Sequence, residues 1–308
     1  MRLVTRSDFD GLACAVLLVE AGVVDSFKFV HPKDVQDGLV EVTKDDVLAN
    51  VPYARGCGLW FDHHSSEDER LLLEEDFTLR GASLPAPSCA RVVYDYYNGS
   101  EKFEKLDRNG LMAAVDKTDS GDLTLDEIKN PRGWVLLSFM MDPRTGLGHH
   151  KGYRISNYQL MEDMIKYCRT MGPEEILKVP DVQERVRRYE EQQRAFEDML
   201  RSNTTVDGNV IVTDLRNVGE IASGNRFTIY ALYPEQNVSV QIMSGKEKKN
   251  VVFSVGHSIV NRTAESNVGS LMLKFGGGGH EKVGTCQVPP EDAERVRGEI
   301  IKRLKAGR

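Results

Sequence analysis

Short apolar runs alternate with helical patterns along the first third of the chain. The runs predict four β-strands, at residues 1–5, 26–30, 46–50 and 58–61. Helical spacing of apolar residues predicts helices at 11–22, 88–97 and 109–119. This alternation predicts a parallel α/β sheet with helices on both faces, whose binding residues lie at the carboxyl ends of the strands.

The pattern changes in the second half of the chain. Residues 180–203 carry apolar side chains at helical spacing between charged ones, which predicts one long amphipathic helix. Beyond it, apolar runs predict strands at 209–215, 227–233, 238–243 and 250–256, and helical patterns occupy 268–275 and 290–305. We therefore predict a parallel α/β domain at 1–172, a linking helix at 173–204 and a smaller mixed α/β domain at 205–308.

Composition and charge narrow the class of protein. With 308 residues, 40% hydrophobic and 28% charged, the chain fits a globular protein with more than one core. Its net charge of −7 argues against binding long duplex nucleic acid, but leaves room for a small anionic substrate in a local pocket. Five scattered cysteines, no leader pattern and no apolar run of about 18–20 residues predict a cytoplasmic protein without a membrane partner. A homodimer is left open.

Acidic residues and histidines follow two of the predicted strands. Asp8 and Asp10 come after the first strand, where two carboxylates two residues apart can reach neighbouring divalent cations. Taken alone, an Asp-x-Asp-Gly string is more typical of a turn and a helix cap. His63 and His64 follow the strand at 58–61, and a tandem histidine pair alone is usually a loop feature.

Two further clusters lie beyond these strands. Asp116 ends a predicted helix and Asp119 lies one turn on, a pattern that alone indicates a solvated helix end. Four consecutive glycines precede His280 and would expose backbone N–H groups suited to phosphate, although a flexible connection is the alternative. Each cluster is a weak signal, and their order and placement at element ends strengthen the joint case for one site.

The strings "DFDG", "DHH", "AAVDKTDSG" and "GGGGHEKVGT" occur in this order along nearly the whole chain. In this respect the sequence resembles the DHH phosphoesterase family with its DHH-associated carboxyl-terminal domain. That family includes RecJ-type exonucleases, nanoRNA and cyclic-dinucleotide phosphodiesterases, and exopolyphosphatase-related proteins. The resemblance implies a two-manganese site in a cleft between the domains, with magnesium as the alternative ion, and in-line attack of water on phosphorus.

The resemblance also implies residue roles. Asp8 and Asp10 would bind metal, and the second metal would be held by Asp10, His63 and Asp116, while His64 would contact the phosphate or protonate the leaving oxygen. The far end of the substrate would be held by residues of the smaller domain: Gly277, Gly278, Gly279 and His280. His257, at a predicted strand end, and the nearby Arg262 are further candidates for phosphate contact.

The sequence departs from the family pattern at two positions, and both would be ligands of the same metal. Arg6 stands where a histidine is expected before Asp8, and Asn50 stands where a bridging aspartate is expected. Arginine cannot bind a cation and an amide is a weak ligand, so we hypothesise one firmly held metal, with Arg6 taking the place of the other and gripping a phosphate. In the alternative, Asp45 or Asp46 supplies the bridge and both metals remain.

The leading functional prediction is a manganese-dependent phosphohydrolase that acts on phosphodiester bonds of short oligonucleotides or linear dinucleotides. The partner is then a small phosphorylated substrate or a short oligonucleotide. Two alternatives stay open: an exopolyphosphatase, and a non-catalytic sensor of a phosphate ligand with a degenerate metal site.

Overall fold

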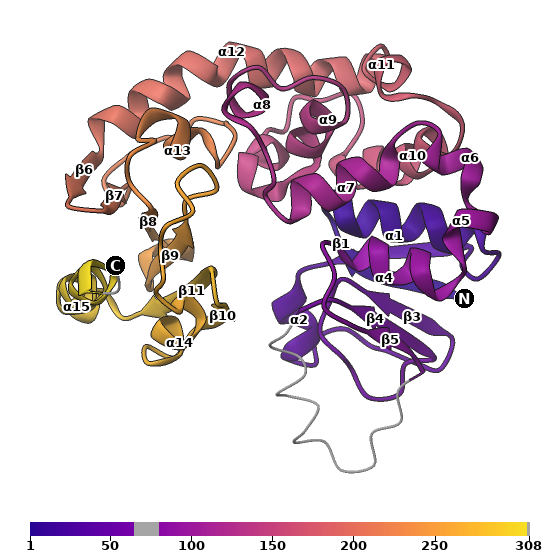
Figure 1. Cartoon of the computed structure of the whole chain (residues 1–308), viewed down its shortest axis with the longest axis horizontal. Helices are drawn as coiled ribbons and strands as arrows, with labels where there is room; N and C mark the ends of the chain where they lie inside the picture. The colour runs from indigo at the N-terminus through magenta and orange to yellow at the C-terminus, as the bar shows by residue number, and fades with distance from the viewer. Residues whose placement is uncertain (65–79, 307–308) are drawn as a thin grey trace. The chain divides into compact units, whose positions relative to one another are not determined.

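In the computed structural model, residues 1–64 and 80–306 are described, and they form two compact units (Figure 1). The first unit comprises residues 1–122 and 131–190, and the second comprises residues 123–130 and 191–308. The predicted linking helix is α12 (Pro180–Ser202), and the division between the units falls inside it. The short segment 123–130 belongs with the second unit, although the sequence placed it in the first domain.

A five-stranded sheet forms the centre of the first unit, with every pair of neighbours parallel. In spatial order its strands are β2 (Ser26–Val30), β1 (Arg2–Arg6), β3 (Asp46–Ala49), β4 (Leu59–Asp62) and β5 (Gly81–Ser83). Four of these strands match the predicted runs. β5 is three residues long and carries too little pattern to be recognised in the sequence.

Side chains alternate between the two faces of this sheet, as the two-residue period of a strand requires. Leu3 and Phe61 join the large core that includes α1 (Phe9–Glu20), whereas their neighbours Val4 and Trp60 belong to a smaller cluster with Val35 on the other face. Both faces are therefore apolar and covered, and the predicted fold class is confirmed.

The helices of the first unit lie mostly on the face that α1 covers, and Figure 1 shows α1 and α4 running across the sheet. Their bounds are α2 (Pro32–Gln36), α4 (Cys89–Tyr96), α5 (Gly99–Lys102), α6 (Glu104–Asp107), α7 (Leu111–Asp119), α9 (Gly133–Met141), α10 (Asn157–Thr170) and α11 (Pro173–Ile176), with short 3-10 turns η1 (Pro143–Thr145) and η2 (Leu147–His149).

A six-stranded mixed sheet forms the second unit, with only β7 and β8 parallel. Its spatial order is β10 (Gly278–His280), β11 (Val283–Val288), β9 (Val251–His257), β8 (Val238–Ser244), β7 (Val210–Asp214) and β6 (Thr204–Asp207). Helices α14 (Val268–Leu273) and α15 (Ala293–Ala306) pack their apolar sides on this sheet. Shorter helical pieces are α8 (Leu125–Lys129), α13 (Thr228–Leu232), η3 (Lys246–Lys248) and η4 (Pro290–Asp292).

One strand prediction is wrong. The apolar run at 227–233 predicts a strand, but it contains the helix α13 (Thr228–Leu232). The Asn225 side chain accepts a hydrogen bond from Phe227 N at 2.9 Å, and the Tyr230 hydroxyl bonds with Ser239 Oγ at 2.9 Å. Local capping and one tertiary contact therefore prevail over the strand propensity of the aromatic and β-branched residues.

None of the helices in residues 1–64 and 80–306 combines the length and the apolar composition that a membrane span requires.

The glycine run of β10 allows a direct stability test. Gly279 has φ +151°, and a Cβ there would lie 2.2 Å from Val283 O, whereas a Cβ at Gly278 would meet no atom within 4 Å. We expect G279A to lower the free energy of unfolding by about 1–3 kcal/mol, because this conformation is open almost only to glycine. Thermal unfolding beside the matched variant G278A measures this, and equal melting temperatures for the two variants would contradict it.

Candidate metal centre

The carboxyl ends of β1, β3 and β4 bring the predicted residues of the first unit together. Asp8 caps α1, since its side chain accepts a hydrogen bond from Gly11 N at 3.0 Å. A Cβ at Gly11 would lie only 2.1 Å from Arg6 O, so glycine is required where the helix turns away from β1. This tight turn places Asp8 and Asp10 at one edge of the sheet.

Asp10 is buried and is held by the first turn of α4. One carboxylate oxygen accepts from Cys89 N at 2.9 Å and the other from Ala90 N at 2.8 Å. Burial, followed by the nearby charges of Asp119 and Asp8, raises the pKa of Asp10 well above its usual value, and the two N–H groups oppose this only in part. A cation beside Asp10 would remove this penalty.

His63 is oriented by a backbone carbonyl. Its Nδ1 lies 3.1 Å from Ala86 O, which can only accept, so Nδ1 carries the proton. In the neutral ring Nε2 then presents its lone pair, and it lies 3.8 Å from Asp10 Oδ2 and 3.4 Å from Asp119 Oδ2. A lone pair that faces two carboxylates is repelled unless a cation lies between them. Metal-bound histidines commonly have this support from a carbonyl.

Asp10, His63 and Asp119 form the candidate cation group. One ligand atom from each lies within 4.8 Å of the other two, close enough for a single ion to reach all three. Two carboxylates and one imidazole form a donor set that suits manganese, since carboxylates favour hard divalent ions and the imidazole favours transition metals. The chemistry of the residues therefore fits the predicted kind of cofactor.

Asp116, predicted as the third ligand, is engaged elsewhere. Its Oδ1 accepts from Ser88 Oγ at 2.7 Å, and its Oδ2 accepts from Arg91 Nη2 at 2.6 Å. Both partners belong to the start of α4, the same turn that holds Asp10. The structure therefore places Asp119 in the group in place of Asp116, and gives Asp116 a part in fixing α4.

Asp8 is surrounded by donors. Asn50 Nδ2 donates to its Oδ1 at 3.0 Å, and Arg6 Nε lies 3.0 Å from its Oδ2. Asn50 adopts a left-handed backbone conformation with φ 56°, one that asparagine tolerates better than most residues. Arg6 thus lies beside Asp8, where the hypothesis of a substituted metal placed it.

Asp46 cannot bridge two metals at this edge. It lies at the amino end of β3, where its carboxylate bonds with Arg2 Nε at 2.6 Å and with Arg2 Nη2 at 3.0 Å. Asp45 precedes it on the same side of the sheet, and its backbone carbonyl accepts from Arg2 N. The alternative in which either aspartate supplies the bridge is therefore wrong.

His64 pairs with the first residue of the DHH string. His64 Nδ1 lies 2.8 Å from Oδ1 of the buried Asp62. Burial alone would lower the pKa of His64, but the hydrogen bond and the charge of Asp62 outweigh burial and raise it. The ring of His64 lies against that of His63 with centroids 4.4 Å apart, so His64 borders the candidate group.

A pocket of about 700 Å³ adjoins this group at the carboxyl ends of β1 and β2. Arg6 and Ser7 line it, and Arg144 of η1 lines it from another part of the chain. Arg144 is held by Asp142, with Nε 2.7 Å from Oδ1. Partial loss of hydration would lower the pKa of Arg144, whose side chain is 43% exposed, but the charge and hydrogen bond of Asp142, and then the charges of Asp8 and Asp119, raise it.

The predicted substrate residues of the smaller domain lie in the second unit. The register pairs His280 of β10 and Gly256 of β9 with Val283 of β11, so His280 and His257 lie at the same end of this sheet. His257 Nε2 lies 2.9 Å from Ser266 O, and burial lowers the pKa of this histidine. Arg262 donates from Nε to Ile259 O at 3.0 Å. Their roles, with those of Gly277, Gly278 and Gly279, stay predictions.

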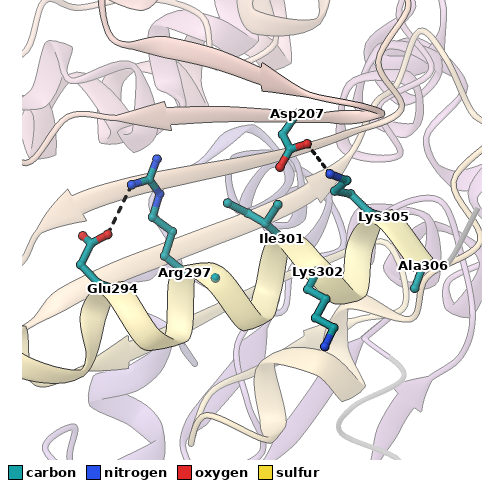
Figure 2. A pocket seen from close by; sticks show the side chains of 8 residues that line it. Asp207, Glu294, Arg297, Ile301, Lys302, Lys305 and Ala306 are labelled. Atoms are coloured by element: carbon teal, nitrogen blue, oxygen red, sulfur yellow. Dashed lines mark hydrogen bonds and ion pairs between the residues drawn. The ribbon is translucent and has the colours of Figure 1, made fainter.

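A second depression, of about 600 Å³, lies along α15 and does not include any of the predicted residues. Figure 2 shows two ion pairs among its charged groups, with Lys302 apart from both: Lys305 bonds with Asp207, and Arg297 lies 3.3 Å from Glu294. Charges that are already compensated and exposed in this way give no sign of a ligand site.

No protein-family model and no curated protein sequence matches the chain. A solved structure does: a pGpG-specific phosphodiesterase, PggH from Vibrio cholerae, is 45% identical, with a TM-score of 0.79 over 100% of this chain and 99% of that one. The chain belongs to the DHH phosphoesterase family. The predicted membership is confirmed, and with it the broad class of phosphohydrolase.

Two more distant structures share the fold. An exopolyphosphatase-related protein from Bacteroides fragilis is 14% identical, with a TM-score of 0.56 over 99% of this chain and 92% of that one. A DHH domain from a protein described as a member of a family of ribosomal proteins is 12% identical, with a TM-score of 0.60 over 98% of this chain and 86% of that one. At 14% and 12% identity, these two structures show only that they share the fold of this DHH phosphoesterase.

Manganese binding can show which of the two aspartates, Asp119 or Asp116, is the metal ligand. We expect manganese to raise the melting temperature of the wild-type protein and of D116N, but not of D119N, because Asp119 lies in the cation group. D116N should instead lower the metal-free stability by about 1–3 kcal/mol, because Ser88 and Arg91 lose a charged partner.

Thermal shift measurements with and without manganese test this prediction. The raised pKa of Asp10 means that protons compete with the cation. The rise in melting temperature that manganese causes in the wild type should therefore be smaller at about pH 6 than at about pH 8. A full manganese response in D119N together with none in D116N would restore Asp116 as the ligand.

Proposed function

We propose that this DHH phosphoesterase is a manganese-dependent phosphodiesterase that hydrolyses short linear dinucleotides such as pGpG. The observation that carries the proposal is the 45% identity with a pGpG-specific phosphodiesterase over the whole chain, together with the group of Asp10, His63 and Asp119. A net charge of −7 favours short substrates over long nucleic acid. A cytoplasmic location and a homodimer remain predictions.

The metal would be held by the two carboxylates and the imidazole. When bound, it supplies Lewis-acid chemistry, lowering the pKa of the attacking water and stabilising charge on the phosphoryl oxygens. The protein keeps the ligands ready: two N–H groups of α4 fix Asp10, and Ala86 O fixes the His63 ring. Such support keeps the ligand atoms in place before the ion arrives.

Arg6 would serve where a second metal would otherwise lie. The Nε atom of its guanidinium lies 3.0 Å from Asp8 Oδ2, and Arg6 also lines the adjoining pocket. A guanidinium offers donors in a fixed fork that matches a phosphate, so it can neutralise and orient a phosphoryl group without an exchangeable ion. We therefore propose one resident cation, with Arg6 as the second positive group.

His64 is the candidate general acid. With Nδ1–H donated to Asp62, its protonated ring has a second N–H with which to protonate the leaving oxygen. The Asp62 carboxylate holds the ring and favours the charged form that this role requires. Asp62 therefore acts as a positioning residue.

Turnover of pGpG decides between the proposed enzyme and the alternatives. We expect manganese-dependent release of GMP from pGpG, no release after chelation, and little release of phosphate from polyphosphate. Chromatography of the products measures all three, with D10N as an inactive variant. Tight binding of pGpG without turnover would favour the sensor, and efficient release of phosphate from polyphosphate would favour the exopolyphosphatase.

The metal count can be tested by restoring the family pattern. Asn50 Nδ2 lies 3.0 Å from Asp8 Oδ1, so N50D would place two carboxylates in contact, and R6H would replace the cation by a ligand. We expect the double variant R6H/N50D to bind about two manganese ions per chain where the wild type binds about one. Elemental analysis measures the count, with R6K as the control that keeps one ion. Two fully occupied peaks at the manganese edge in wild-type crystals would contradict the single-metal proposal.

The pH dependence of turnover tests His64. Because the pKa of His64 is raised, the ring stays protonated until the pH climbs through that raised value, and general-acid catalysis is lost above it. D62N removes the main cause of the rise, so the alkaline limb of the kcat profile should move to lower pH. H64Q should lower kcat by about 10²–10⁴-fold. An unmoved limb in D62N would exclude His64 as the acid.

A further inference from the structure

The pocket beside the candidate metal centre lies wholly within the first unit, and Arg6 is the one of its lining residues to which the chemistry described above gives a role. It opens where β1 and β2 end, between the start of α2 and the turn η1. Arg6 belongs both to its lining and to the group around Asp8. A substrate whose phosphate meets Arg6 would therefore extend a neighbouring part into this pocket.

The size and walls of the pocket suit a flat ring. Its volume is about 700 Å³, within the range of small-molecule sites. Apolar walls come from Phe29, Val30, Leu39, Val40 and two prolines. The Phe29 ring is held by an edge contact with Tyr158, with centroids 5.4 Å apart at 79°. A phosphate alone would leave most of these walls unused, whereas a nucleobase would cover them.

The polar groups of the pocket are of two opposite kinds. Lys28 and Asp34 both line it, and no side-chain hydrogen bond or ion pair engages the Lys28 ammonium or the Asp34 carboxylate in the part of the chain that the structure describes. His31 Nδ1 accepts from Lys33 N at 3.2 Å, so in the neutral ring Nε2 carries the proton and is a donor. The pocket thus offers one carboxylate acceptor together with two donors.

We propose that this pocket binds a guanine base of the dinucleotide and that Asp34 selects it, an inference that rests on the proposed function. Guanine carries adjacent N1–H and N2–H donors that one carboxylate can accept together, and O6 and N7 acceptors that Lys28 and His31 can reach as donors. Adenine has an unprotonated N1 on the same edge, which a carboxylate repels. Enzymes that act on nucleotides read this edge in the same way.

The test is the preference for pGpG over pApA. We expect the ratio of kcat/KM for the two dinucleotides to fall about tenfold to hundredfold in D34N, mainly through a lower value for pGpG. The matched control is D37N, because Asp37 lies in the same turn but pairs with Lys33 and does not line the pocket. Equal losses on both substrates in D34N, or an unchanged ratio, would overturn the assignment.

A binding measurement keeps this test independent of catalysis. Calorimetry of the whole chain in chelator should show tighter binding of GMP than of AMP, with the difference lost in D34N and kept in D37N. If the wild type hydrolyses no dinucleotide but binds GMP in this way, the proposed function fails and the guanine pocket stands. If GMP and AMP bind alike, the guanine pocket is overturned whatever the turnover.

Discussion

The candidate metal centre depends on the hydrogen bonds between the buried carboxylate of Asp10 and the first turn of α4. The carboxylate joins residues 79 and 80 positions apart, because its two oxygens accept hydrogen bonds from the backbone N–H groups of Cys89 and Ala90. A carboxylate taken out of water is tolerated only where such donors, or a cation, compensate for its lost hydration. Two free N–H groups at a helix start supply part of that compensation, and the positive end of the helix adds to it.

The same turn of α4 is held from a second direction. Asp116 of α7 bonds with Ser88 and Arg91, so α7 and α1 are both tied to one short stretch of chain. Asp119 lies one helical turn beyond Asp116, and its place beside His63 follows from the place of α4. The candidate metal centre is therefore an outcome of helix packing as much as of the strand ends.

Much of this could be predicted from the sequence, and the gaps have physical causes. Strand ends marked by Asp10 and His63 were recognisable because parallel strands deliver their following residues to one edge. The choice between Asp116 and Asp119 was not recognisable, since residues three apart share a helix face and the contacts of Asp116 with Ser88 and Arg91 distinguish the two. Arg144 was missed because nothing in the order of the chain brings residue 144 to the ends of β1 and β2.

The glycine string shows a different limit. In the sequence, this string suggests a phosphate loop. In the structure, Gly277 and Gly279 are needed so that β10 can approach β11, because a Cβ at either position would lie within 2.2 Å of a carbonyl oxygen. Gly276 and Gly278 both have open space where a Cβ would lie, although Gly276 has φ +74°, which favours glycine. A glycine run that suggests a phosphate loop can thus be required by strand packing at some of its positions, and only the structure shows at which ones.

The pairing of Arg6 with Asp8 has a consequence for how the protein depends on its surroundings. A metal ion exchanges with solution, so the occupancy of its site depends on the free concentration of that metal, and other ions can displace it. A guanidinium is part of the chain, keeps its charge at any physiological pH and cannot be exchanged. With one ion and Arg6, as proposed above, the centre would keep the charge of the guanidinium when metal is scarce, and only the charge of the ion would vary with the metal concentration.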